Sequence, residues 1–165
     1  MIRSTDCRSP DVRRGRLPLG EYLALDKGIP EQKKLRDKEK DGEYFIPAAF
    51  SRPDTRLAKD VALLDAFVID LDCGNVSRGD IEARLVDMRY LAYPSYSHHP
   101  ADKRWRIVIP YARTITPERH DAVYAFFKQS FGAKFDERSK TTSQLWYTPA
   151  CPQDAKKHFE FFVGE

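Results

Sequence analysis

The stretch AFVIDLD at residues 66–72 decides both the fold and the candidate site of this chain. Its apolar run predicts a buried strand, which ends in two aspartates with one leucine between them. Because side chains alternate along a strand, Asp70 and Asp72 face one side of the sheet and Leu71 faces the other. Two carboxylates so close repel each other unless a cation lies between them, and hard divalent ions prefer carboxylate oxygens. The stretch therefore predicts the start of a Mg²⁺ or Mn²⁺ site; an acidic strand end that faces water is the alternative.

The composition indicates one globular domain with local basic groups. A length of 165 residues fits a single domain, and a hydrophobic fraction of 41% is enough for a real core. The formal net charge is only +3, yet Arg and Lys are concentrated in residues 1–40, 103–113 and 134–140. Such groups suit a polyanionic partner, nucleic acid or nucleotide phosphates, although ordinary solubilising charge is the alternative.

The cysteines and the apolar runs indicate the compartment. Cys7, Cys73 and Cys151 are far apart and odd in number, which predicts no disulfide framework and a reducing cytosol. No apolar run approaches the roughly 18 residues of a membrane span, and the charged N-terminus lacks the apolar core of a secretory signal. We therefore expect a cytoplasmic protein with no membrane partner.

Two regions are expected along the chain: a basic N-terminal extension over residues 1–40 with a short helix near residues 21–25, and a main domain over residues 41–165. Ser77 with Asp80 predicts a capped helix, and Thr116-Pro117 with Gly132 predicts the start and end of another. A loop is expected at 48–57, and strands at 43–47, 66–69, 90–93, 105–109, 144–147 and 159–163, several of them stopped by proline. This order predicts an α+β fold in which two helices cover one face of a mixed or antiparallel sheet, as in a split βαβ unit, with the other face free for a ligand.

Three further stretches carry side chains suited to phosphate chemistry. Ser95-Tyr96-Ser97-His98-His99 follows a predicted strand, where hydroxyls and imidazoles can hold phosphate oxygens; an ordinary exposed histidine pair is the alternative. Arg104 and Arg106 share one face of the next strand, and arginine there is costly unless it meets an anion such as phosphate. Asp136 is a candidate third carboxylate, with a turn aspartate as the alternative. Three carboxylates that hold two metals, with basic side chains nearby, indicate phosphoryl or nucleotidyl transfer.

The ordered pattern SYSH…RWRIVIP…RTIT…FD…S…QLWYTPACP, over residues 43–152, resembles the archaeo-eukaryotic primase superfamily, especially the primase-polymerase domains of phage and plasmid replication proteins. The resemblance implies an RRM-like catalytic core in residues 41–165. It implies that Asp70, Asp72 and Asp136 bind the metals.

The resemblance also implies which residues contact the incoming nucleotide, and here the chain departs from the pattern. Ser97 and His98 match the Ser/His element that contacts the nucleotide phosphates. In many relatives the histidine opens the following strand, where Arg106 stands in this chain. His98, His99 and Arg106 are therefore all candidates to bind the triphosphate, and Lys103 joins the expected nucleotide-binding residues.

The activity that the resemblance implies is that of a DNA primase or primase-polymerase. Such an enzyme makes short primers from NTPs or dNTPs on single-stranded DNA, with two Mg²⁺ or Mn²⁺ ions, in phage or plasmid replication. A replicative helicase or another replication protein is an expected partner. Tyr96, Trp105 and Tyr147 are candidate base-stacking platforms, with core packing as the alternative for Trp105 and Trp146.

Two other functions stay open at this point. One is a nucleic-acid-binding module on the same fold without catalysis, which the basic segments and aromatic side chains suit. The other is a Toprim-type primase or nuclease, because that fold also has a DxD turn. Toprim chemistry needs a glutamate at an earlier strand end, and Glu43, the only candidate, precedes its strand.

Overall fold

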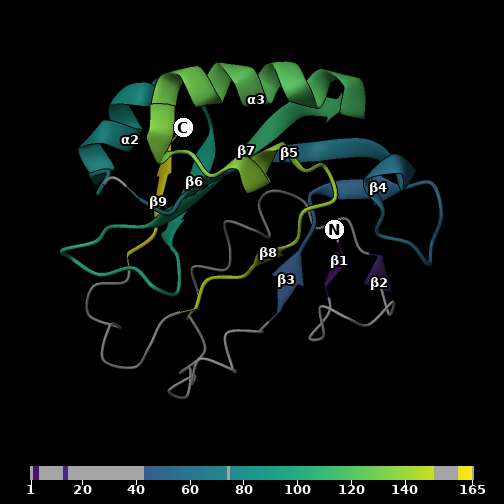
Figure 1. The fold of residues 1–165 in the computed structure, drawn as a ribbon, viewed down its shortest axis with the longest axis horizontal. Helices are drawn as coiled ribbons and strands as arrows, with labels where there is room; N and C mark the ends of the chain where they lie inside the picture. The colour runs from purple at the N-terminus through teal and green to yellow at the C-terminus, as the bar shows by residue number, and fades with distance from the viewer. Residues whose placement is uncertain (1, 4–12, 15–42, 74, 151–159, 165) are drawn as a thin grey trace.

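The computed structural model describes residues 2–3, 13–14, 43–73, 75–150 and 160–164, and a five-stranded sheet is its centre. The elements of the main domain are β3 (Tyr44–Phe45), β4 (Ala48–Phe50), β5 (Val61–Leu71), α2 (Arg78–Arg84), β6 (Tyr90–Pro94), β7 (Trp105–Ile115), α3 (Pro117–Phe131), β8 (Trp146–Tyr147) and β9 (Phe162–Gly164), with 3₁₀ turns η3 (Ala58–Asp60), η4 (Gly132–Lys134) and η5 (Glu137–Lys140). The sheet has the order β4-β5-β7-β6-β9, and each neighbouring pair is antiparallel. Figure 1 shows α2 and α3 above this sheet and the β3–β8 ribbon below it.

The middle of the chain forms a split βαβ unit. β5, α2 and β6 follow one another in sequence, and β7 inserts between the two strands. Because β7 is antiparallel to both neighbours, β5 and β6 run in the same direction. β4 pairs with the start of β5, and β9 pairs with β6 at the opposite edge. The expected α+β fold is therefore confirmed.

Alternation along β5 divides the core into two layers. Phe67 and Leu71 are fully buried and pack with the apolar faces of α2 and α3. Ala66 and Val68 face the other way and pack against Trp146 of the β3–β8 ribbon. The helices thus cover one face of the sheet, as expected. The opposite face was predicted to be free, and this prediction is wrong because the ribbon covers part of it.

Local signals define where the helices begin and end. Ser77 and Asp80 form the predicted capping box, since each side chain accepts a hydrogen bond from the backbone N–H of the other. Pro117 stands in the first turn of α3, and Gly132 ends that helix with a φ of 64°. Glycine adopts this left-handed value without steric strain, which explains its place there.

Three local predictions were wrong. Residues 48–50, expected in a loop, form β4 because they pair with residues 61–64. β7 continues through Pro110, although proline was expected to end it. The partner strand β5 shifts register between Leu64 and Ala66, next to this point, and proline is tolerated at such irregularities. The helical spacing of Val123, Phe126, Phe127 and Phe131 predicts one shared apolar face of α3. Phe126 is nevertheless 52% exposed, whereas Phe127 and Phe131 are buried.

The capping box makes the stability of α2 dependent on pH. Hydrogen bonds from the Ser77 side chain and backbone lower the pKa of Asp80 from 3.8 to about 2. Because the folded state binds this proton less tightly than the unfolded chain, the stabilisation is full above pH 3.8 and is lost as the pH falls toward 2. We expect Ser77→Ala to return this pKa toward 3.8 and to flatten the pH dependence of unfolding in that window. NMR titration and urea unfolding measure the two effects; an unchanged Asp80 pKa in the variant would contradict the account.

Only parts of the N-terminal extension are described. Ile2–Arg3 (β1) and Arg13–Arg14 (β2) pair as antiparallel strands, so this basic segment contains a short ribbon. The helix expected near residues 21–25 lies outside the described residues. In the described ranges, no helix has both the length and the apolar character that crossing a bilayer requires.

Candidate metal centre

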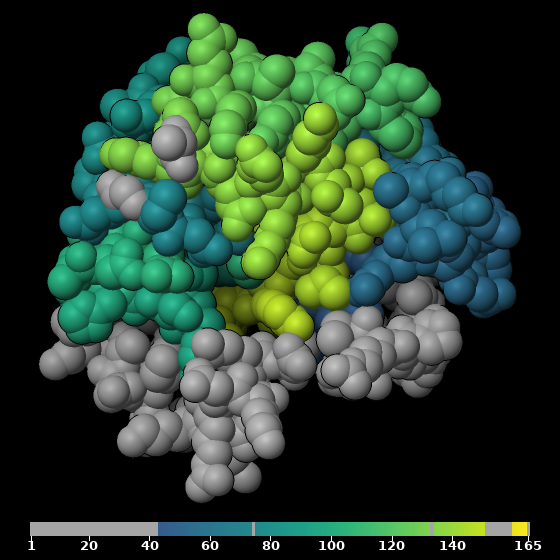
Figure 2. Space-filling view, viewed as in Figure 1, coloured from purple at the N-terminus to yellow at the C-terminus, as the bar shows by residue number. Residues whose placement is uncertain are grey.

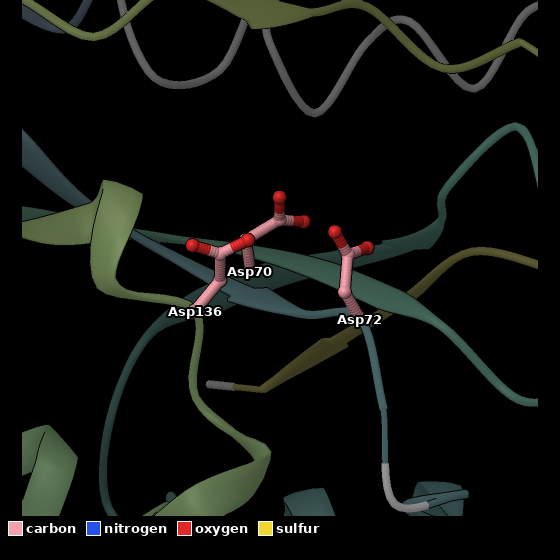
Figure 3. Close-up of side chains that lie close together, drawn as sticks. All are labelled: Asp70, Asp72 and Asp136. Atoms are coloured by element: carbon pink, nitrogen blue, oxygen red, sulfur yellow. The ribbon is translucent and has the colours of Figure 1, made fainter.

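Three aspartates from distant parts of the chain meet at the end of β5. One carboxylate oxygen from each of Asp70, Asp72 and Asp136 lies within 4.8 Å of the others. Figure 3 shows the three side chains pointing to the same side of the sheet. Asp70 is 2% exposed, whereas the other two are half-buried. The structure thus brings the three predicted carboxylates together, and their role as metal ligands stays a prediction.

Hydrogen bonds and packing hold the segment after α3 against the end of β5. The Asp136 backbone N–H donates to the Asp70 carbonyl at 2.9 Å, and the Asp70 N–H donates to Ser139 Oγ at 3.3 Å. The ring of Phe135 stacks with that of Phe67 at 6.1 Å between centroids, which anchors the turn before Asp136 in the core. Figure 2 shows this segment, in yellow-green, on the surface between α3 and the blue segment that contains β4. Hydrogen bonds and ring packing between segments far apart in the sequence therefore place Asp136 next to Asp70.

Arg106 lies directly across from Asp70 in the β5–β7 pairing. Its Nη2 donates to both carboxylate oxygens of Asp70, at 3.2 and 3.3 Å, and its Nη1 donates to the Tyr147 carbonyl at 3.3 Å. The guanidinium also lies over the ring of Trp146, 5.2 Å from its centroid. Its side chain is only 13% exposed. This arginine thus pairs with Asp70, and its predicted contact with a nucleotide phosphate stays a prediction.

A second buried aspartate shows how this protein satisfies a carboxylate fully. Asp60 accepts three hydrogen bonds from Arg52, at 2.8, 2.9 and 3.1 Å, and one from Thr55 at 2.6 Å. The Thr55 hydrogen bond is the main cause that lowers the pKa of Asp60, and Arg52 lowers it further. This carboxylate is saturated with donors and has no need of a further cation.

The Asp70 carboxylate is much less well compensated. Among the described residues, it receives only the two long contacts from a single Arg106 nitrogen. Burial raises the pKa of Asp70; Arg106 opposes this rise, and the charges of Asp72 and Asp136 add to it. A buried carboxylate with weak pairing is unfavourable unless another cation compensates it. Three carboxylates offer the all-oxygen ligand set of Mg²⁺ or Mn²⁺, so the residues present fit the predicted metal.

The predicted phosphate ligands of the β6–β7 loop make other contacts. His98 Nδ1 lies 2.9 Å from the Arg104 carbonyl oxygen, and its ring meets that of Trp105 edge-on at 4.8 Å between centroids. His99 is exposed and forms an isolated antiparallel β-bridge with Asp102 across the tight turn. Ser97 is exposed as well. In the described part of the chain, these contacts shape the loop, and none of them is with the three carboxylates.

Two basic residues at the end of this loop lie near the turn that follows β5. The Lys103 backbone N–H donates to the Asn75 side chain, which ties the loop to the turn after β5. Arg104 donates two hydrogen bonds to Asp102, at 2.7 and 2.9 Å. Asp102 is the main cause of the raised pKa of Arg104, and Asp72 contributes to it. Arg104 therefore lies within electrostatic range of the cluster.

The aromatic side chains considered for base stacking differ in their burial. Trp105 and Trp146 are 6% and 4% exposed and belong to the core, which confirms the packing alternative for both. The Trp105 indole N–H donates to the Val76 carbonyl at 2.8 Å. Tyr96 and Tyr147 are half-buried. Their role as stacking platforms stays a prediction.

The fold and the site together define a class of protein: an α+β domain whose split βαβ unit gathers three carboxylates and a buried arginine at the end of one strand. Residues 25–164 match the VapE N-terminal domain family, and because this match spans most of the chain, the chain belongs to that family. The membership links it to replication-associated proteins of phages and plasmids. No curated protein and no solved structure gives a significant match.

Proposed function

We propose that this domain is a DNA primase or primase-polymerase, which synthesises short primers on single-stranded DNA by nucleotidyl transfer during phage or plasmid replication. One observation carries the proposal: three carboxylates converge within 4.8 Å, and the buried one among them is poorly compensated. The family membership supports the setting in replication. NTPs or dNTPs, a single-stranded template and a replication protein such as a helicase are the partners that follow.

Asp70, Asp72 and Asp136 would hold two Mg²⁺ or Mn²⁺ ions. When bound, such ions neutralise the charge of a triphosphate and activate an attacking hydroxyl. The chain itself prepares the site. The Arg106 guanidinium donates to the Asp70 carboxylate and opposes the rise in the Asp70 pKa that burial causes, which favours the ionised form.

Basic residues stand on two segments next to the acidic cluster. Arg104 directly precedes Trp105, which pairs with Leu71, so Arg104 and Asp72 stand at the adjoining strand ends of the β5–β7 pairing. Arg138 and Lys140 are exposed on η5, and the Arg138 backbone N–H donates to the Asp136 carboxylate at 2.8 Å. Cations around a metal-binding carboxylate group suit the phosphates of nucleotides and of a template strand. This charge pattern supports a nucleic-acid substrate.

The runner-up is a nucleic-acid-binding module without catalysis. The Arg106–Asp70 pair favours it, because one of the three carboxylates already has a cationic partner in the chain itself. A Toprim-type site has less support. Among the described residues, the one group of carboxylates close enough to share a metal consists of Asp70, Asp72 and Asp136, without Glu43.

Template-directed synthesis separates the two leading functions. The full chain is incubated with single-stranded DNA, labelled nucleotides and Mn²⁺ or Mg²⁺, and the products are resolved by length. A primase yields short, template-dependent oligomers that disappear when a chelator removes the metal. Clear template binding without any product, for every nucleotide and both metals, would overturn the enzyme and leave the binding module.

A further inference from the structure

His120 is a buried polar side chain on α3 that the proposed function does not use. It is 4% exposed, and its ring lies 5.2 Å from that of Phe67 on β5, between centroids. Its Nε2 lies 3.0 Å from the Ser139 carbonyl oxygen. A carbonyl oxygen can only accept a hydrogen bond, so Nε2 carries the proton and donates. The ring therefore links α3 to the segment that carries Asp136.

The other ring nitrogen indicates that this histidine stays neutral. Within the described ranges, His120 Nδ1 is buried and has no hydrogen-bond partner. A second proton on the ring would thus be a buried donor without an acceptor. Burial also lowers the pKa of His120. The ring consequently acts at neutral pH as a fixed single donor.

Ser139 connects this donor to the carboxylates. It is 2% exposed, and its Oγ accepts the Asp70 backbone N–H. The Asp70 carbonyl in turn accepts the Asp136 N–H. Residues 136–139 therefore form hydrogen bonds with both backbone polar groups of Asp70. His120, on α3, donates a hydrogen bond to the same segment.

We propose that His120 is a positioning residue for the three-carboxylate site. By donating to the Ser139 carbonyl, it fixes residues 136–140 against β5 and so sets where Asp136 stands relative to Asp70. This inference rests on the proposed metal site, and His120 itself touches neither metal nor nucleotide. Substitution of a residue that orients metal ligands typically weakens metal affinity by about 10–100-fold.

Two variants of the full chain separate the donor from the packing of the ring. His120→Phe keeps a ring beside Phe67 and removes the donor, whereas His120→Gln keeps an N–H donor at similar reach and removes the ring. Mn²⁺ affinity is measured by electron paramagnetic resonance at neutral pH. We expect His120→Phe to bind Mn²⁺ about tenfold more weakly and His120→Gln to stay close to the wild-type protein. The reverse order would show that only packing matters and would overturn the proposal.

A second measurement on the metal-free chain keeps the two proposals apart. Hydrogen exchange of the Asp70 and Asp136 amides is compared with that of Leu85, whose N–H donates to Ile81 in α2. His120→Phe should accelerate exchange at the Asp70 and Asp136 amides about tenfold and leave exchange at Leu85 unchanged. A tenfold change corresponds to a free energy of local opening that is lower by about 1.4 kcal/mol. Unchanged exchange at Asp136 would overturn the positioning role. A wild-type chain that binds no Mn²⁺ would instead overturn the metal site.

Discussion

Asp70→Asn is expected to abolish primer synthesis, with a loss of about a thousandfold or more, equivalent to about 4 kcal/mol of transition-state stabilisation. Asparagine has nearly the same size, so the packing at the end of β5 is preserved. It removes the charge of the most buried member of the cluster, which is 2% exposed. Synthesis on a single-stranded template in the presence of Mn²⁺ measures the loss.

Asp60→Asn is the matched control for this variant. It removes the charge of another buried aspartate, one that Arg52 and Thr55 saturate and that stands apart from the cluster. We expect it to lower the stability of the chain and to leave synthesis intact under conditions where it is folded. Equal losses in the two variants would assign the effect to folding, and an active Asp70→Asn enzyme would contradict the proposed site.

Arg106→Met is expected to lower the free energy of unfolding by about 3–5 kcal/mol. Methionine fills much of the volume but leaves Asp70 buried beside two other carboxylates, without its guanidinium. The Tyr147 carbonyl also loses one of its donors, although the Tyr93 hydroxyl still donates to it at 3.0 Å. Urea unfolding of the metal-free protein measures the change.

The double variant Asp70→Asn with Arg106→Met tests the physical reason. If the loss comes from an uncompensated charge, removing that charge as well restores most of the stability, because replacing both partners of a buried ion pair is often nearly neutral. Mn²⁺ should stabilise Arg106→Met more than it stabilises the wild-type protein, since it replaces the missing cation. A double variant no more stable than Arg106→Met would show that the arginine acts through packing alone.

The elements that the sequence predicted well are those whose signals are local. The apolar run of residues 66–69 predicts β5 by itself, and the Ser77–Asp80 capping box predicts where α2 begins. Pro117 and Gly132 mark the two ends of α3 in the same way. The burial of Trp146 follows from its place in a short apolar run. Each of these depends on a few neighbouring residues and on the periodicity of helix or strand.

What could not be predicted depends on register and on long-range packing. Arg106 meets Asp70 because the β5–β7 pairing places them opposite each other, and the strand sequence alone does not specify its partner. Asp136 was expected in the site, but the packing of Phe135 on Phe67 that brings it to the cluster has no local signal in the sequence. His120 and Ser139 carry no signal in the sequence, since neither spacing nor composition shows that they will meet. Which buried charges pair is therefore decided by the assembled sheet.

The most direct test of the central claim is Mn²⁺ binding to the wild-type chain and to Asp136→Asn, measured by electron paramagnetic resonance at neutral pH. Asp136 joins Asp70 and Asp72 only in the folded chain, and it lies within 4.8 Å of both. The account predicts that the wild-type protein binds Mn²⁺ and that Asp136→Asn weakens binding about tenfold or more, as Asp72→Asn does. A wild-type protein that binds no Mn²⁺, or an Asp136→Asn variant that binds it equally well, would contradict the account.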